Sequence, residues 1–391
     1  MSDQPSHFRT GLVLILCLGL VAGLIRCSRQ PPERSEIRVG LLADYSALEN
    51  RPTVKAAKLA VEAIHDAGGL AVGGDRHRVV LIIEDTQNTP EDTSRAALKL
   101  INQEEVVAIV GPHISRNVLP VSIAAETARI PMISPGSTNP RTTAGKDFVF
   151  RVAFTDSLQC EALARLALDE LRTPKAAVLY DIASAYSRDL ATMFKQGFET
   201  AGGQVVAFES YTSGDQDFRR QLTHIGQRMP GMLFLPNLNP DVIAQAKQAR
   251  QLGIAGTLVG GDGWIPEGLI EHPELEGGFA VQHWHPDVAA TNPQARAFIA
   301  AYRQAYAEDP TSFAALTYDA VGLIFQAIRL AGRADPESIR QALSRLDHYS
   351  GVTGTITYRG TVGDPQKPAL LVQLKRGRVI LHEQVDPESR R

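Results

Sequence analysis

The strongest constraint on the fold is an order of segments that occurs twice along the chain. A β-branched run at 37–42 precedes a helical pattern that stops at Ala67-Gly68-Gly69, and a further apolar run follows at 79–85. The same order restarts at 175–180, where the helical pattern stops at Ala201-Gly202-Gly203, 134 residues after the first stop. The repeat predicts two α/β lobes of similar topology. Because Gly-Gly helix stops occur in many α/β proteins, the repeat by itself leaves this prediction open.

Hydrophobic spacing supports the same architecture. Apolar residues recur at helical intervals in both copies: Val54, Ala57, Val61 and Ile64 in the first, and Leu190, Phe194 and Phe198 in the second. Between the copies, a helix is predicted at 90–103, a strand at 106–110, a helix near 118–127 and a strand at 131–134. Such alternation is typical of parallel sheets covered by helices on both faces. The predicted fold class is therefore α/β, with two Rossmann-like lobes of parallel sheet and a ligand cleft between them.

The first 35 residues predict a targeting segment and a tether outside the fold. Residues 11–25 carry no charge and would form a helix of about 22 Å, shorter than a hydrocarbon core of roughly 30 Å. This length is typical of a secretory signal, which leaves cleavage, lipidation at Cys27 and an uncleaved anchor open. Arg26 occupies the position where a lipoprotein signal needs a small residue, so we expect inefficient lipidation. We predict a periplasmic or extracytoplasmic protein, with any inner-membrane anchoring through this segment only.

Composition and missing motifs weigh against several classes of protein. The 40 Lys and Arg and 43 Asp and Glu give a net charge of −3, which disfavours a basic nucleic-acid binder. Beyond the N-terminal segment Cys160 is the one cysteine, so no disulfide framework or cysteine-based zinc site is expected. Dinucleotide, P-loop, zincin and nucleophile-elbow motifs are absent from the sequence. His283-Trp284-His285 offers two imidazoles without a third ligand at motif spacing, so no metal, other cofactor or catalytic residue is predicted.

Polar loops follow two neighbouring predicted strands. The first is Gly111–Ser115, and the second is Ser134–Pro140. Within them Ser115, Ser137 and Thr138 offer hydroxyls, while Gly136 lets a ligand approach the backbone. Hydroxyls and free amides near helix N-termini suit a carboxylate. The same residue types also serve as turns and helix caps that bind nothing, so both interpretations stay open at this point.

Taken together, these loops resemble the periplasmic leucine/isoleucine/valine-binding protein family, the type I solute receptors of branched-chain amino acid ABC transporters. The resemblance runs from Glu36 to Ile380. It rests on five motifs: Gly111-Pro112-x-x-Ser115, Ile133–Pro140, Ala185-Tyr186-Ser187, the turn Gly214–Phe218 and Gly260-Gly261-Asp262-Gly263. The combination is more specific than any one of these motifs.

The family fold implies two Rossmann-like lobes joined by three crossovers, with the ligand trapped as the lobes close. The crossovers are expected near 154–156, 282–285 and 362–367. The corresponding division gives lobe 1 as 36–155 plus 286–365, lobe 2 as 156–285 plus 366–383, and a C-terminal tail at 384–391.

The resemblance also implies a role for individual residues. Ser115 and Thr138 correspond to the family residues that hold the ligand carboxylate. The Gly136 carbonyl and the acid Asp262 correspond to the groups that bind the ammonium. Tyr186 corresponds to the aromatic residue that closes over the ligand from the second lobe.

Three positions depart from the family pattern. Asp262 is one methylene shorter than the glutamate often found there, so the ammonium must sit deeper or bind through water. Leu238 stands near a second family aromatic, which predicts a changed side-chain preference. The first loop, 44–49, is short and charged, and Glu49 either faces solvent or contacts a polar ligand. Apart from these three departures, Ser137 is also predicted to bind the ligand, because it offers a hydroxyl next to Thr138.

The expected function is binding without catalysis. The resemblance implies a receptor that captures an amino acid, aliphatic or branched-chain, and delivers it to the membrane permease of an ABC transporter. An alternative is a ligand-sensing module for amides, urea or amino acids in a regulatory system. An enzyme of doubly wound fold is a third interpretation, which lacks a nucleophile–base pair to support it. No nucleic-acid partner is expected.

Overall fold

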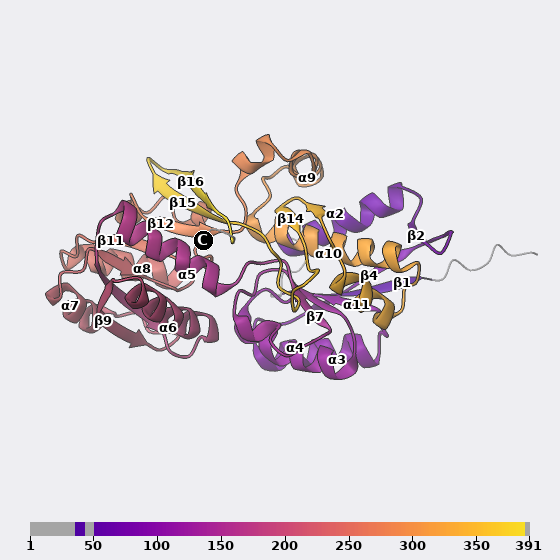
Figure 1. Ribbon diagram of the computed structural model, residues 1–391, viewed down its shortest axis with the longest axis horizontal. Helices are drawn as coiled ribbons and strands as arrows, with labels where there is room; N and C mark the ends of the chain where they lie inside the picture. The colour runs from indigo at the N-terminus through magenta and orange to yellow at the C-terminus, as the bar shows by residue number, and fades with distance from the viewer. Residues whose placement is uncertain (1–35, 44–50, 388–391) are drawn as a thin grey trace, which may run out of the picture. The chain divides into compact units, whose positions relative to one another are not determined.

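The computed structural model describes residues 36–43 and 51–387, and the elements divide into two groups built around separate sheets (Figure 1). The predictions for the targeting segment, Cys27 and Glu49 lie outside the described residues.

The first lobe is built on a five-stranded parallel sheet in the order β4-β1-β5-β6-β7. Its strands are β1 (Ile37–Ala43), β4 (Val79–Asp85), β5 (Ala108–Val110), β6 (Met132–Ser134) and β7 (Val149–Arg151). The helices between them are α2 (Pro52–Asp66), α3 (Pro90–Asn102) and α4 (Ser115–Ala128), with a 3-10 turn, η2, at Pro140–Thr142. The apolar positions predicted on one face of α2 are all buried, so the helical spacing correctly identified the core face.

The second lobe repeats this strand order as β9-β8-β10-β11-β12. Its parallel strands are β8 (Lys175–Asp181), β9 (Gln204–Tyr211), β10 (Met232–Phe234), β11 (Thr257–Gly260) and β12 (Phe279–Gln282). The accompanying helices are α5 (Asp156–Arg165), α6 (Ala185–Thr200), α7 (Arg219–Gln227) and α8 (Asn239–Gln251), with short segments η3 (Leu166–Glu170), η4 (Pro266–Gly268) and η5 (Pro273–Leu275). The prediction of two α/β lobes is confirmed.

Antiparallel strands that the sequence did not predict add to this parallel plan. In the second lobe β15 (Ala369–Lys375) pairs antiparallel with β12, and β16 (Arg378–Val385) pairs antiparallel with β15. Arg376 and Gly377 form the connecting turn with φ of 55° and 64°, the left-handed geometry that tight hairpins need. Since β16 ends at the buried Val385, regular structure extends into the predicted tail. Two small hairpins complete the strands: β2 (Leu70–Val72) with β3 (Asp75–His77), and β13 (Tyr349–Gly351) with β14 (Gly354–Ile356).

The chain returns to the first lobe after β12. It forms η6 (Pro286–Ala290), α9 (Pro293–Tyr306), α10 (Ser312–Ala331) and α11 (Pro336–Ser344) before β13 and β14. Helix α10 has the length and apolar composition of a membrane span, and two thirds of that span is buried inside the fold. It contributes Leu316, Ala320 and Ile324 to the core that α2 also covers, which is the position of a central core helix. The residue limits predicted for the lobes stay a prediction.

Candidate functional site

Two adjoining cavities, of about 40 and about 210 Å³, lie among the loops that follow the strands of both lobes. They share five lining residues: His113, Ile114, Leu238, Asp262 and Phe313. The smaller cavity is completed by Ser115, Arg116, Gly136, Ser184, Tyr186 and Gly263. The larger one extends toward Arg51, Gln282 and Thr311. This is the position in which doubly wound sheets bind ligands, at the carboxyl ends of their strands.

Five of the residues predicted from the sequence come together here. Ser115 begins α4 after β5, and Gly136 follows β6 in the first lobe. Tyr186 lies in the first turn of α6, Leu238 precedes α8, and Asp262 follows β11 in the second lobe. Their contact with a ligand remains a prediction, but the fold places them around one space.

Ser137 and Thr138 are not among the residues lining either cavity. The Ser137 hydroxyl lies 2.9 Å from the Ser115 hydroxyl and 2.7 Å from that of Thr142, so it supports Ser115 from behind. The Thr138 hydroxyl lies against the carboxyl group of Asp156, where it acts to lower the pKa of that acid. Both residues are therefore buried beside the described cavities, and a ligand contact for either stays a prediction.

Asp262 is held by donors from three separate elements. Its Oδ1 accepts from Gln159 Nε2 and from the Tyr186 hydroxyl, both at 3.0 Å, and its Oδ2 lies 3.1 Å from His283 Nε2. A carboxylate offers about four acceptor positions, so Oδ2 retains one. Asp262 is only 8% exposed. Burial raises the pKa of Tyr186, which keeps its phenol protonated as a donor.

A second acid lies behind the first. Gln159 Nε2 also donates to Asp156 Oδ1 at 2.8 Å, so one amide group joins Asp156 and Asp262. Asp156 is fully buried at the start of α5. Burial raises its pKa to about 7, and the neighbouring charge of Asp262 acts in the same direction. No sequence pattern marked Asp156 as part of the site, because an aspartate at a helix start is usually a cap.

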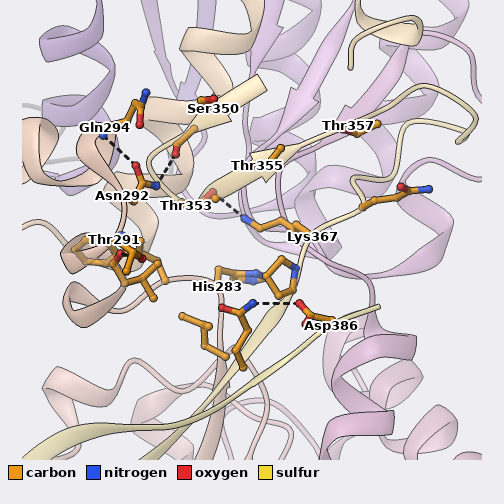
Figure 2. A pocket seen from close by; sticks show the side chains of 18 of the residues that line it. His283, Thr291, Asn292, Gln294, Ser350, Thr353, Thr355, Thr357, Lys367 and Asp386 are labelled. Carbon is orange, nitrogen blue, oxygen red and sulfur yellow. Dashed lines mark hydrogen bonds between the residues drawn. The ribbon is translucent and has the colours of Figure 1, made fainter. Parts of the chain in front are cut away.

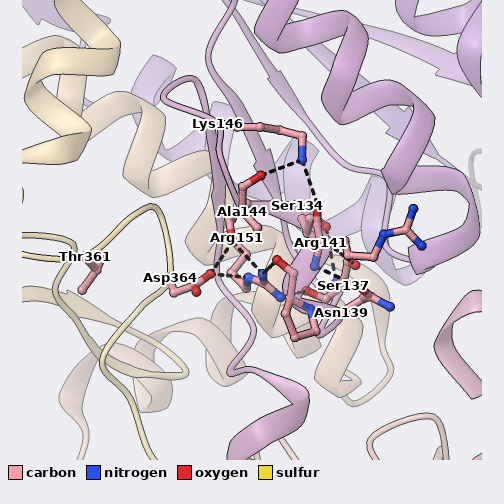
Figure 3. A network of polar contacts seen from close by, with 12 residues as sticks. Ser134, Ser137, Asn139, Arg141, Ala144, Lys146, Arg151, Thr361 and Asp364 are labelled. Atoms are coloured by element: carbon pink, nitrogen blue, oxygen red, sulfur yellow. Dashed lines mark hydrogen bonds and ion pairs between the residues drawn. The ribbon is translucent and has the colours of Figure 1, made fainter. Parts of the chain in front are cut away.

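Arg151 fixes the loop that carries Gly136 (Figure 3). Its guanidinium group is fully buried and pairs with Asp364 at 2.7 Å. It also donates to the Ser137 carbonyl at 3.0 Å and to the Thr143 hydroxyl at 2.7 Å. Asp364 belongs to the segment between β14 and β15, and Arg151 ends β7. This cluster therefore connects two of the segments that join the sheets to the loop at the cavity wall.

His113 closes the first-lobe side of the cavity as a neutral ring. Its Nε2 lies 2.9 Å from the Thr317 hydroxyl, which itself donates to the Phe313 carbonyl, so Nε2 carries the proton. Burial lowers the pKa of His113 to about 3. A Cβ atom at Gly136 would stand 2.7 Å from His113 Nδ1, which explains why this loop position requires glycine.

Arg116 is a cavity residue that the sequence reasoning missed. It is the second residue of α4, lines the smaller cavity, and donates to the Asn88 carbonyl at 3.3 Å. An arginine at the start of a helix carries no pattern that separates a ligand contact from a solvated surface residue. Only the placement of α4 against the second lobe reveals it.

The histidines at 283 and 285 do not form a metal site with other described residues, among which no suitable group of three ligands occurs. Both follow β12 instead of lying within a strand. His283 contacts Asp262, and the Nδ1 atom of His285 lies 3.5 Å from a carboxylate oxygen of Asp287.

Comparison with known proteins identifies the family. The Periplasmic binding protein family matches residues 36–378. The chain belongs to this family. A leucine-, isoleucine-, valine-, threonine- and alanine-binding protein of Pseudomonas aeruginosa is 27% identical over 328 residues, which cover 82% of this chain and 83% of the relative.

Solved structures agree with this assignment and with the fold. The leucine-binding protein LivK of Thermotoga maritima shares 31% identity with a TM-score of 0.82, covering 90% of this chain and 99% of LivK. The protein LivJ of Streptococcus pneumoniae, solved with isoleucine, shares 28% identity with a TM-score of 0.81, covering 90% and 100% of the two chains. The resemblance to the leucine/isoleucine/valine-binding proteins predicted from the loop motifs is confirmed.

Proposed function

We propose that this chain binds a free amino acid with an aliphatic side chain between its lobes and delivers it to the permease of an ABC transporter. The observation that carries the proposal is the charge arrangement of the smaller cavity. Asp262 lines it from the second lobe, and Arg116 lines it from the first, beside Ser115 at the N-terminus of α4. An amino acid presents the complementary pair, an ammonium and a carboxylate on neighbouring atoms.

The energetics of burial favour a cationic group at Asp262. A buried carboxylate is costly unless it is paired and hydrogen-bonded. Its three described donors are a neutral amide, a phenol and an imidazole, so the carboxylate has hydrogen bonds without a full counter-charge. A ligand ammonium supplies both the charge and the remaining hydrogen bond. The carboxylate of the same ligand is expected near Ser115, where the helix N-terminus favours an anion.

The apolar part of the lining supports an aliphatic side chain. Ile114, Leu238 and Phe313 line both cavities. Each buried methylene contributes about 0.8 kcal/mol, so such a surface favours leucine, isoleucine or valine over polar amino acids. The relatives named for these three amino acids, and the isoleucine bound to LivJ, support the same class.

Transport by capture and release needs no chemistry at the site, and the relatives are binding proteins. We therefore propose a receptor without enzymatic activity. An extracytoplasmic location follows from the family, and we propose that residues 1–35 provide export and any membrane anchoring.

Calorimetry with ligand fragments tests the proposal. L-Leucine should bind more tightly than 4-methylpentanoate, which lacks the ammonium, and than 3-methylbutylamine, which lacks the carboxylate. At 100 times its Kd, L-leucine should stabilise the fold by about 2.7 kcal/mol. If a panel of amino acids shows no binding while urea or a short amide does, the proposal is wrong and the sensing alternative replaces it.

A further inference from the structure

His283 contacts Asp262 of the candidate site and lies on one of the segments that join the two sheets. Its Nε2 lies 3.1 Å from Asp262 Oδ2, and its ring packs on Phe154 with centroids 3.9 Å apart. Phe154 stands just before α5, and His283 stands just after β12. His283 also lines a separate cavity of about 870 Å³, together with Lys367 (Figure 2). His283 therefore contacts both the acid of the site and the segment that leads into α5.

The hydrogen bonds determine which form of the imidazole is present. An ionised carboxylate only accepts, so the proton of His283 lies on Nε2, toward Asp262. Nδ1 is buried and has no hydrogen-bond partner among the described residues. A second proton on Nδ1 would therefore lack an acceptor, and a buried donor without an acceptor is costly. Burial lowers the pKa of His283 and outweighs the hydrogen bond and charge of Asp262, which act to raise it, while the nearby charge of Lys367 adds a smaller lowering effect.

A neutral donor and a charged donor would have opposite consequences for ligand binding. A neutral imidazole orients Asp262 and leaves its negative charge available. An imidazolium would become the counter-ion of Asp262 and would compete with the ammonium of the ligand. In a buried site this competition is strong, because charges interact there with little solvent screening.

We propose that His283 is the positioning residue for Asp262, which it orients for the ligand ammonium while neutral, and that its protonation weakens amino-acid binding in acid. This inference rests on the proposed function, since it requires an ammonium-bearing ligand. His283 acts through Asp262 and is not assigned a ligand contact of its own.

Other charged and titratable groups surround His283. They are Asp262 after β11, Lys367 before β15 and His113 after β5, and Asp156 at the start of α5 interacts with Asp262. Lys367 donates to the Thr353 hydroxyl at 2.7 Å, and that hydroxyl donates to Asp319 at 2.6 Å. Burial lowers the pKa of Lys367 to about 8, so the lysine gains little further charge below pH 7. His113, with a pKa of about 3, stays neutral above pH 5.

Asp156 does titrate in the relevant range, because its pKa is about 7. Its protonation would also weaken attraction for an ammonium. The substitution Asp156→Asn removes this contribution, so the His283 variants are best compared on that background.

The experiment measures the Kd of L-leucine by calorimetry from pH 8 to pH 5. On the Asp156→Asn background, the Kd should rise by up to tenfold per pH unit below the pKa of His283. Adding His283→Gln should flatten this rise, because the glutamine amide nitrogen lies as many bonds from Cα as Nε2 does and cannot be protonated. Adding His283→Asn should give a Kd at pH 8 about tenfold higher than His283→Gln gives. The asparagine amide nitrogen lies as many bonds from Cα as Nδ1 does, so it is too short to replace the Nε2 donor to Asp262. His285→Gln, at the neighbouring histidine, should keep the acid dependence.

Three results would overturn the inference. One is an acid dependence that persists in the His283→Gln chain, and another is equal affinity of the Gln and Asn variants at pH 8. The third is a parent chain that binds no amino acid at pH 8, which would overturn the proposed function as well and is seen before any variant is made. Binding stoichiometry in each titration reports the folded fraction, so misfolding is separated from weakened binding.

Discussion

The two lobes share a strand order but bring different chemistry to the cavity. The first lobe supplies a hydroxyl at Ser115, a guanidinium at Arg116 and open backbone at Gly136. The second supplies the carboxylate of Asp262 and the phenol of Tyr186. A repeated topology therefore does not imply a repeated site, because the loops after equivalent strands differ in sequence. The division suits a ligand that carries an ammonium and a carboxylate close together, as an amino acid does.

The lobes also differ in how they hold their polar groups. In the second lobe, three donors fix a single buried charge at Asp262. In the first, a chain of neutral hydroxyls runs from Ser115 through Ser137 to Thr142. Losing a charge costs more than losing a neutral hydrogen bond, so removing the charge of Asp262 should reduce affinity more than removing the hydroxyl of Ser115 or Ser137.

The largest effect is expected from Asp262→Asn, which keeps the shape and removes the charge. Removing one member of a desolvated charge pair typically costs about 2–5 kcal/mol, or roughly 30-fold to several-thousand-fold in Kd. Calorimetry with L-leucine measures this loss, and Asp262→Ala should be at least as damaging. An affinity within threefold of the parent would show that Asp262 does not bind the ammonium.

Asp156→Asn tests the second acid through stability in the absence of ligand. With a pKa of about 7 in the folded chain against 3.8 unfolded, the unfolded chain releases this proton first. Asp156 therefore lowers the free energy of unfolding progressively as pH rises from about 4 to about 7. Above pH 7 this loss of stability is constant. The stabilisation by Asp156→Asn should be larger at pH 8 than at pH 5 by roughly 2–3 kcal/mol. Denaturant unfolding at both values measures it, and an equal effect at both would contradict the raised pKa.

A paired substitution distinguishes the two hydroxyls of the first lobe. Ser115 lines the cavity, whereas Thr138 lies beneath it beside Asp156. Ser115→Ala should weaken L-leucine binding by about 1.5–3 kcal/mol, the usual loss for a hydrogen bond to a charged group. Thr138→Val should weaken it less. The reverse order would restore Thr138 as the main hydroxyl for the ligand carboxylate, as the family resemblance implies.

The smallest effect on affinity is expected at Leu238, which should decide preference and not binding itself. Leu238 is 37% exposed and lines both cavities. Leu238→Tyr should re-rank leucine, isoleucine and valine by several-fold, since one methylene of burial contributes about 0.8 kcal/mol. Competition binding with the three amino acids measures the order, and an unchanged order would place their side chains elsewhere in the cavity.

The sequence alone determined the two lobes and most of their elements. Helical spacing and Gly-Gly stops are local signals, so the faces of α2 and α6 could be identified without any knowledge of packing. The loops at Ser115 and Gly136 were found because carboxyl ends of parallel strands meet at one edge of a sheet, whereas Asp262 was found only through the family resemblance. The antiparallel addition of β15 and β16 was missed, because strand direction depends on pairing between distant segments.

Only the tertiary structure decided which groups control the charge of the site. Gln159 contacts Asp262 across 103 residues of sequence, and His283 contacts it across 21. The neutral state of His113 and the raised pKa of Asp156 both come from burial. Neither a contact between distant residues nor the loss of surrounding water is written in the local pattern of residues. Sequence therefore predicted where the candidate site forms, and the packed structure decided its electrostatics.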